Sequence, residues 1–129
     1  QLGFDFHSLS SKTNPILSNV QLSYTFINAE AEILEMGLSR YALENLIHQL
    51  RLGANLNYGS RISHHISFGY YDRANLEDYS VVDTRLRYKA NRLTLFADVT
   101  NLFDITYQET NLVVMPGRWF KVGFELQVY

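Results

Sequence analysis

The sequence predicts an all-β fold, namely an antiparallel up-and-down β-barrel whose strands have one apolar and one polar face. Three observations predict it: apolar and polar residues alternate along most of the chain, tight turns alternate with long connections, and aromatic residues are abundant. The 129 residues include 9 Tyr, 8 Phe and 1 Trp, and these residue types favour strands. A chain of this length forms at most one domain, so residues 1–129 are treated as a single unit.

Alternation with a period of two defines the expected strands. The run from 46 to 58 is typical, because its even positions are mainly apolar and its odd positions mainly polar. A shorter alternation at Leu2, Phe4 and Phe6 adds a partial first strand, so we expect seven strands. The remaining runs span 20–26, 62–70, 82–89, 93–100 and 120–128. Segment 31–44 is rich in helix formers, and a short helix there is the alternative to a loop.

The connections alternate in length. Tight hairpin turns are expected at 58–61 and 89–92, where Gly59 and Asn91 supply a permissive backbone. Longer loops are expected at about 31–45, 72–79 and 102–117. Short turns at one end and long loops at the other are typical of outer-membrane barrels, and strands of about 9–11 residues can cross the hydrocarbon core at a tilt.

Charged side chains in these runs all fall on the polar face. In a membrane barrel that face lines the lumen, where charges contact a plug or line a solute path. We expect cross-strand pairs of opposite charge, for example between Arg87 and Asp98. Lys89 belongs to the same face. The residues expected to face the lumen are Arg51, Asp83, Arg85, Arg87, Asp98, Lys121 and Glu125.

The period does not say where the apolar face points. A soluble β-barrel encloses it around a small apolar ligand, whereas a membrane barrel turns it to lipid. Aromatic residues near both strand ends resemble interfacial girdles and favour the membrane barrel. Near the short turns these residues are Tyr58, Tyr88 and Tyr129, and near the long loops they are Phe26, Tyr41, Tyr70, Tyr79, Trp119 and Phe120.

Composition and motifs argue against several other functions. The chain has no Cys, which excludes disulfides and Cys-based metal sites, and its 11 basic and 13 acidic residues show no basic run for nucleic acid. His64 and His65 point to opposite faces of a strand and cannot share one metal in that geometry. There is no Gly-x-Ser-x-Gly motif and no phosphate-binding loop. We therefore expect no enzyme and no cofactor.

The C-terminal third carries more specific motifs in a fixed order. A strand ends in Asn101-Leu102-Phe103-Asp104, Tyr107 follows, then Pro116-Gly117-Arg118, and a last strand ends in the aromatic Tyr129. We interpret Asn101, Tyr107, Pro116 and Gly117 as architectural: the Asn satisfies backbone groups where a strand ends, and Pro-Gly suits a turn that needs a positive φ at Gly.

This order resembles the end of a TonB-dependent outer-membrane receptor. The resemblance covers about residues 79–129 closely and the rest by strand pattern, and residues 41–44 are loosely similar to the cobalamin-receptor branch. It implies the C-terminal part of a 22-stranded barrel that imports cobalamin, a siderophore or haem across the outer membrane. The chain departs from the family in having no plug domain or TonB-contacting segment, and in its tail, where Gln127 and Glu125 occupy positions that are usually apolar.

The resemblance also implies partners. These are the remaining barrel and the plug, TonB through the plug, outer-membrane lipid, a small-molecule substrate and a surface lipoprotein; nucleic acid is not among them. Seven strands would leave two open edges, so we expect a C-terminal fragment or one chain of a split barrel. A complete small outer-membrane barrel is the weaker alternative. Loop residues expected to contact a solute or partner are Glu30, Glu32, Glu35, Arg40, Tyr41, Asp72, Arg73, Glu77, Asp78 and Tyr79.

Overall fold

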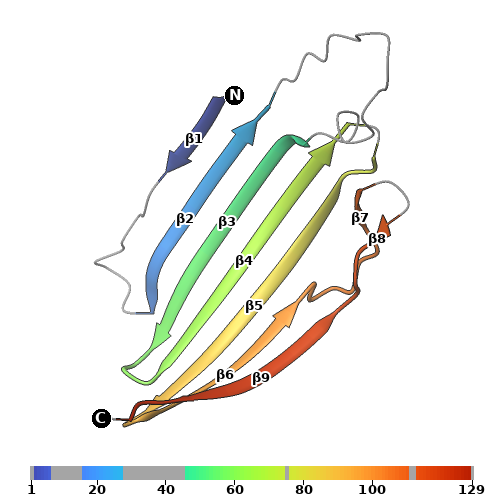
Figure 1. Ribbon diagram of the computed structural model, residues 1–129. Coiled ribbons are helices and arrows are strands. Elements are labelled where there is room, and N and C mark those ends of the chain that lie inside the picture. Colours follow the sequence, from blue (N-terminus) through green and yellow to red (C-terminus); the bar gives the residue numbers. More distant parts are fainter. Residues whose placement is uncertain (1, 7–15, 28–45, 75, 111–112, 129) are drawn as a thin grey trace, which may run out of the picture.

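Every element that the structure describes is a β-strand. The structure, a computed structural model, describes residues 2–6, 16–27, 46–74, 76–110 and 113–128 (Figure 1). The main sheet is antiparallel, with strand order β1-β2-β3-β4-β5-β6-β9. Its strands are β1 (Leu2–Phe6), β2 (Leu17–Phe26), β3 (Leu46–Tyr58), β4 (Ile62–Arg73), β5 (Tyr79–Ala90), β6 (Leu93–Thr100) and β9 (Trp119–Leu126). The all-β prediction is confirmed, and the seven expected strands form the main sheet.

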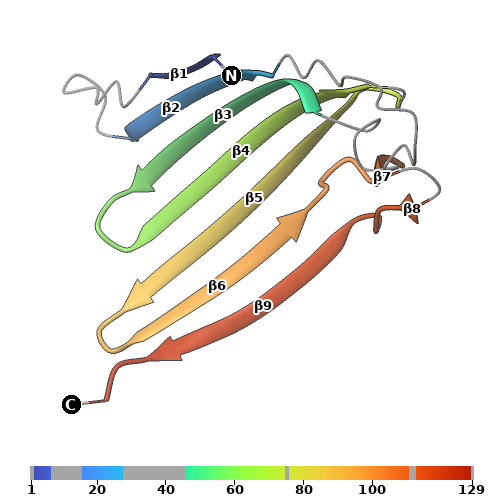
Figure 2. The ribbon, with the colours of Figure 1, turned by 45° about the horizontal axis from the view of Figure 1, so that its top comes forward.

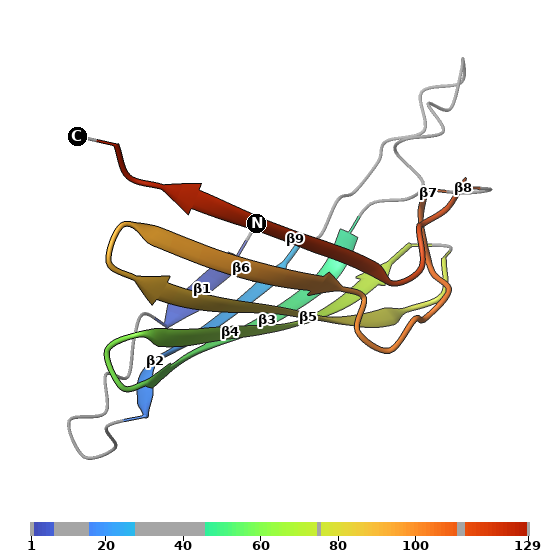
Figure 3. The same cartoon turned by 90° about the horizontal axis from the view of Figure 1, so that it is seen from below.

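The sheet is open. β1 and β9 are its two edge strands and do not pair with each other, so the described strands form a curved sheet and not a closed barrel (Figures 1 and 3). The alternative helix at 31–44 lies outside the described residues. Within the described parts of the chain, no helix has the length and apolar character to cross a membrane.

The two tight turns form as expected. Gly59 follows β3 with a φ of 69°, and Asn91 follows β5 with a φ of 47°. Both values lie in the left-handed region, which Gly and Asn tolerate better than most residues. Both turns lie at the same end of the sheet, opposite the β4–β5 connection and the β7–β8 hairpin (Figure 2).

Two of the expected long loops differ from the prediction. One is shorter, and the other contains a small hairpin. β4 continues to Arg73 because its ladder with β3 continues through the His48–Asp72 and Leu46–Arg73 pairs. The β4–β5 connection is therefore 74–78 and not 72–79. The expected loop 102–117 contains a small hairpin formed by β7 (Gln108–Thr110) and β8 (Val113–Val114).

The register of each strand pair places apolar-face residues opposite apolar-face residues. One row runs Leu22–Leu52–Phe68–Val82 across four strands, and its members face the apolar side. No second layer covers this apolar face in the described structure: Leu52 is 39% exposed and Phe124, on the edge strand, is 69% exposed. Among the described hydrophobic residues only Tyr79 counts as buried.

Two aromatic residues lie on the opposite face from the one expected. Tyr79 pairs with Tyr71, and Trp119 pairs with Thr100, and both pairs belong to the polar face. The reason is parity, because the apolar positions of β5 and β9 are even-numbered and both residues are odd-numbered. Tyr79 and Trp119 therefore do not join an aromatic girdle on the apolar face.

Candidate functional site: the hollow on the polar face

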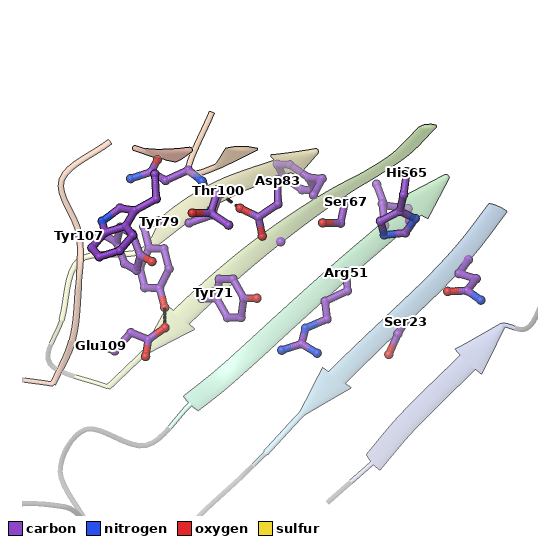
Figure 4. A pocket seen from close by; sticks show the side chains of 18 of the residues that line it. Ser23, Arg51, His65, Ser67, Tyr71, Tyr79, Asp83, Thr100, Tyr107 and Glu109 are labelled. Atoms are coloured by element: carbon purple, nitrogen blue, oxygen red, sulfur yellow. Dashed lines mark hydrogen bonds between the residues drawn. The ribbon is translucent and has the colours of Figure 1, made fainter. Parts of the chain in front are cut away.

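A hollow of about 770 Å³ lies on the polar face near the longer connections (Figure 4). It extends from β2 to β9 and is bounded on one side by the residues around the β7–β8 hairpin. A second, smaller hollow nearer the tight turns is also lined mainly by polar-face residues. Because both hollows lie on the polar side, that side is the concave one. The labelled lining residues are Ser23, Arg51, His65, Ser67, Tyr71, Tyr79, Asp83, Thr100, Tyr107 and Glu109.

Three tyrosines form one wall of the hollow. The rings of Tyr71 and Tyr79 stack with centroids 5.0 Å apart, and those of Tyr79 and Tyr107 stack at 4.4 Å. Tyr79, whose ring lies between the other two, is 7% exposed. Its hydroxyl donates to Glu109 Oε1 over 3.4 Å. Arg51 lies 5.9 Å from the Tyr71 centroid, at the distance of a cation–π contact.

Glycine makes room for this wall. A Cβ on Gly69 would lie 2.7 Å from Cε2 of the Tyr71 ring, so that ring rests on the backbone of its own strand. The Tyr107 ring comes from outside the main sheet and is partly buried against Tyr79. Burial raises the pKa of the Tyr107 phenol, and the negative charges of Glu109 and Asp83 add to the effect. Tyr107 therefore remains a neutral hydrogen-bond donor at physiological pH.

Asn101 organises the chain where β6 ends. It is 3% exposed and has a φ of 51°. Its side chain donates from Nδ2 to the Ile105 carbonyl and accepts at Oδ1 from the Ile105 amide. The backbone amide of Asn101 donates to Asp83 Oδ1 at 2.9 Å. The Asn therefore satisfies backbone groups at a strand end, and it also ties the turn to β5.

Asp104 connects this turn to the Pro-Gly-Arg segment. Its φ is 57°, and its Oδ1 accepts from the Arg118 amide at 2.7 Å. A Cβ on Gly117 would lie 2.6 Å from the same oxygen. The expectation that Gly117 needs a positive φ is wrong, because its φ is not positive. A Cβ at position 117 would push the Asp104 carboxylate away from the Arg118 amide that it bonds.

Charged side chains form a ladder across the polar face nearer the tight turns. Arg85 donates from Nε to Asp98 Oδ1 at 2.7 Å and from Nη2 to Asp98 Oδ2 at 2.8 Å. Lys121 Nζ lies 3.2 Å from the same Oδ2. These three residues are direct cross-strand partners on β5, β6 and β9. The expected Arg87–Asp98 pair is wrong: Arg87 instead bonds Glu125 at 2.8 Å, across the intervening strand β6.

The structure separates the residues expected to contact a solute. Of the described members of that set, Tyr79 lines the hollow. Asp72 pairs with His48 on the apolar face, and Glu77 and Asp78 are exposed in the 74–78 connection. Glu30, Glu32, Glu35, Arg40 and Tyr41 lie outside the described residues, as does Tyr129. Seven residues expected to face the lumen, Arg51, Asp83, Arg85, Arg87, Asp98, Lys121 and Glu125, occupy polar-face positions in the ladders.

Sequence reasoning did not assign most of the residues that line the hollow, among them Tyr71, His65, Trp119 and Glu109. Trp119 could have been found from its odd position in β9. Glu109 could not, because its place depends on the β7–β8 hairpin. His65 Nδ1 bonds Asn55 Oδ1 at 2.8 Å, while His64 Nε2 bonds Thr84 Oγ1 at 2.6 Å on the other face. The described residues hold no group of three or more His, Cys, Asp or Glu side chains suited to a metal ion.

Comparison with known proteins returned no match to a protein-family model, a curated protein or a solved structure. The geometry alone therefore indicates what the hollow can do. Stacked phenol rings, the exposed Trp119 and the guanidinium of Arg51 offer flat surfaces and hydrogen-bond donors, while Glu109 offers an acceptor. This combination suits binding of a large ring-containing polar solute.

Proposed function

We propose that this chain forms part of the wall of a TonB-dependent outer-membrane receptor that imports a scarce solute, such as cobalamin, a siderophore or haem. The observation that carries the proposal is the direction of the two faces. The polar face lines both hollows, and no other described residues cover the apolar face on the convex side of the sheet. That arrangement suits a wall between lipid and an aqueous lumen, because lipid solvates apolar side chains and cannot satisfy charged ones.

Two alternatives fit this arrangement less well. A soluble β-barrel around a small apolar ligand needs the apolar face to line the hollow. A complete small outer-membrane barrel needs the edge strands to meet, and in the described sheet β1 and β9 are unpaired edges. The proposal therefore includes further strands, from the remaining barrel of the receptor, on both edges. It places the chain in the C-terminal part of a 22-stranded wall.

In this proposal the two halves of the polar face have different roles. The hollow near the longer connections faces the incoming solute, with Tyr71, Tyr107 and Trp119 as its contact surfaces. The Asp98 ladder lies deeper, where it contacts the plug. TonB acts through that plug, and a surface lipoprotein covers the longer connections. No catalytic role is part of the proposal.

Extraction behaviour and native mass test the proposed wall. The protein is extracted from outer membranes in detergent, and the mass of the particle that contains this chain is measured. We expect the chain to require detergent and to occur together with a plug and further strands. A particle that stays soluble and monodisperse without detergent, with this chain alone in it, would contradict the proposal.

Solute binding tests the hollow itself. The full receptor is titrated with cobalamin, a ferric siderophore and haem, and the dissociation constant is measured for each. We expect Tyr107→Ala to raise the dissociation constant of the cognate solute by tenfold or more. Each tenfold change corresponds to a loss of about 1.4 kcal/mol of binding free energy. Phe103→Ala is the matched control, because Phe103 is also aromatic but is exposed outside the hollow. Equal loss in both variants would remove the hollow as the binding site.

A further inference from the structure

Arg51 is an exposed cation in the hollow that contains the tyrosine wall (Figure 4). Its cross-strand neighbours on the polar face are Ser23 of β2 and Gly69 of β4. Serine has a short side chain and glycine has none, so neither neighbour reaches over a guanidinium group. The register therefore leaves the Arg51 guanidinium open to the hollow.

Two neutral groups hold this guanidinium in place. Gln49 lies two residues earlier on the same face of β3. With its amide oxygen turned toward Arg51, it accepts from Nε at 2.6 Å and from Nη2 at 2.8 Å. The Tyr71 ring centroid lies 5.9 Å from Arg51 Cζ. Both partners orient the guanidinium without neutralising it, and its Nη1–Nη2 edge is left for two parallel hydrogen bonds to a ligand.

The acidic residues of the hollow bond other groups. Asp83 accepts from the Asn101 amide, and Glu109 accepts from the Tyr79 hydroxyl. Within the part of the chain that the structure describes, no ion pair joins Arg51 to an acidic side chain. Asp83 lies on β5, two strands from β3, so the two backbones are about 10 Å apart. The hollow therefore has a positive side at β3 and a negative side at β5 and the β7–β8 hairpin.

The Tyr71 hydroxyl is a second donor beside this cation. A Cβ built on Gly69 would lie 2.8 Å from the Tyr71 hydroxyl oxygen. Because Gly69 is the cross-strand neighbour of Arg51, the phenol group lies over the row that carries Arg51. Figure 4 shows the hydroxyl directed toward the side of the hollow where Arg51 lies. A guanidinium and a phenol hydroxyl can together donate to the oxygens of one anionic group.

We propose that Arg51, together with the Tyr71 hydroxyl, binds a carboxylate or phosphate group of the imported solute. This inference rests on the proposed function and adds the charge of the solute and the residue that recognises it. A guanidinium that is oriented, open and without an acidic partner suits such a group, because charge-assisted hydrogen bonds are stronger than neutral ones. The uncharged part of the solute then lies against the aromatic rings, toward Asp83 and Glu109.

Pairs of solutes that differ in an anionic group test the inference. The full receptor is titrated with haem and haem dimethyl ester, with cobalamin and cobinamide, which lacks the phosphate, and with a ferric carboxylate siderophore and its methyl ester. In a pair that binds, we expect the anionic member to bind about 10- to 100-fold more tightly, the range for hydrogen bonds to a charged group. Arg51→Gln should remove this difference. Arg51→Lys keeps the positive charge and should retain part of it.

Arg61→Gln is the matched control, because Arg61 is also exposed but lies in the β3–β4 turn, outside both hollows. It should leave every dissociation constant unchanged. Equal binding within each pair, or equal weakening of both members by Arg51→Gln, would overturn the inference and leave the receptor proposal intact. So would a less stable Arg51→Gln protein with unchanged selectivity, because Arg51 would then pair with an acidic group of the receptor itself. Binding of no solute from any pair would overturn the proposed solutes and this inference together.

Discussion

Removing the Asp98 carboxylate should destabilise the sheet more than removing either cation that it binds. Its side chain is 8% exposed, whereas those of Arg85 and Lys121 are 47% and 67% exposed. When one cation is deleted, the carboxylate keeps the other. When the carboxylate is deleted, two cations lose their shared acceptor at once.

The geometry sets the expected magnitudes. Hydrogen bonds to charged groups contribute about 1.5–3 kcal/mol. Arg85 binds Asp98 through two such bonds, but its exposure lets water replace part of the lost interaction. We therefore expect Asp98→Ala to lower the free energy of unfolding by about 2–3 kcal/mol. Lys121→Ala should cost less than about 1 kcal/mol, as for an exposed ion pair.

A double-mutant cycle isolates the central pair. Unfolding of the full receptor by guanidinium chloride is measured in vesicles for Arg85→Ala, Asp98→Ala and the combined variant. The coupling free energy should be about 1–2 kcal/mol, within the range for residues that share hydrogen bonds. A coupling below about 0.5 kcal/mol would refute the reasoning. A cost for Lys121→Ala equal to that of Asp98→Ala would also refute it, because burial would then not determine the order.

Three further predictions follow from single contacts. Gly117→Ala should cost about 1–3 kcal/mol by overpacking against Asp104, and Asp104→Ala should relieve part of that cost, which unfolding of the double variant measures. Tyr79→Phe should cost about 1 kcal/mol because it removes the hydroxyl that bonds Glu109 at 3.4 Å and also bonds Arg73. Tyr79→Ala should cost about 3 kcal/mol through loss of the stacked ring, as denaturant midpoints will report. In vesicles, Leu22→Arg should cost about 2–4 kcal/mol while the adjacent Gln21→Arg stays within about 0.5 kcal/mol, and equal costs would contradict a lipid-facing side.

The period of two was enough to predict the seven strands of the main sheet and the face of most of their side chains. The odd residue numbers of Tyr79 and Trp119 also predict that both lie on the polar face. The error arose because the aromatic residues were grouped by strand end alone. The error at Arg87 had a different origin. Parity places Arg85 and Arg87 on one face, but the cross-strand partner depends on register. The turn that pairs Ala90 with Leu93 fixes Arg85 opposite Asp98.

Contacts distant in sequence could not be predicted from the pattern. The need for glycine at position 117 comes from Asp104, which approaches it from a turn 13 residues earlier in the chain. The place of Glu109 beside Tyr79 depends on the β7–β8 hairpin, a segment that reads as loop because it has no clear alternation. The candidate site was therefore only partly predictable. Its sheet residues follow from parity, and its remaining wall comes from a connection.

The most direct test of the account is a comparison of lipid and water accessibility at two neighbouring positions of β2. The chain has no Cys, so Leu22→Cys and Gln21→Cys each place a single labelling site within it. A spin label is attached at each position in the full receptor in vesicles, and its relaxation by oxygen and by a water-soluble nickel complex is measured. The account predicts that oxygen dominates at position 22 and the nickel complex at position 21. Greater access of the nickel complex at position 22 than at position 21 would contradict it.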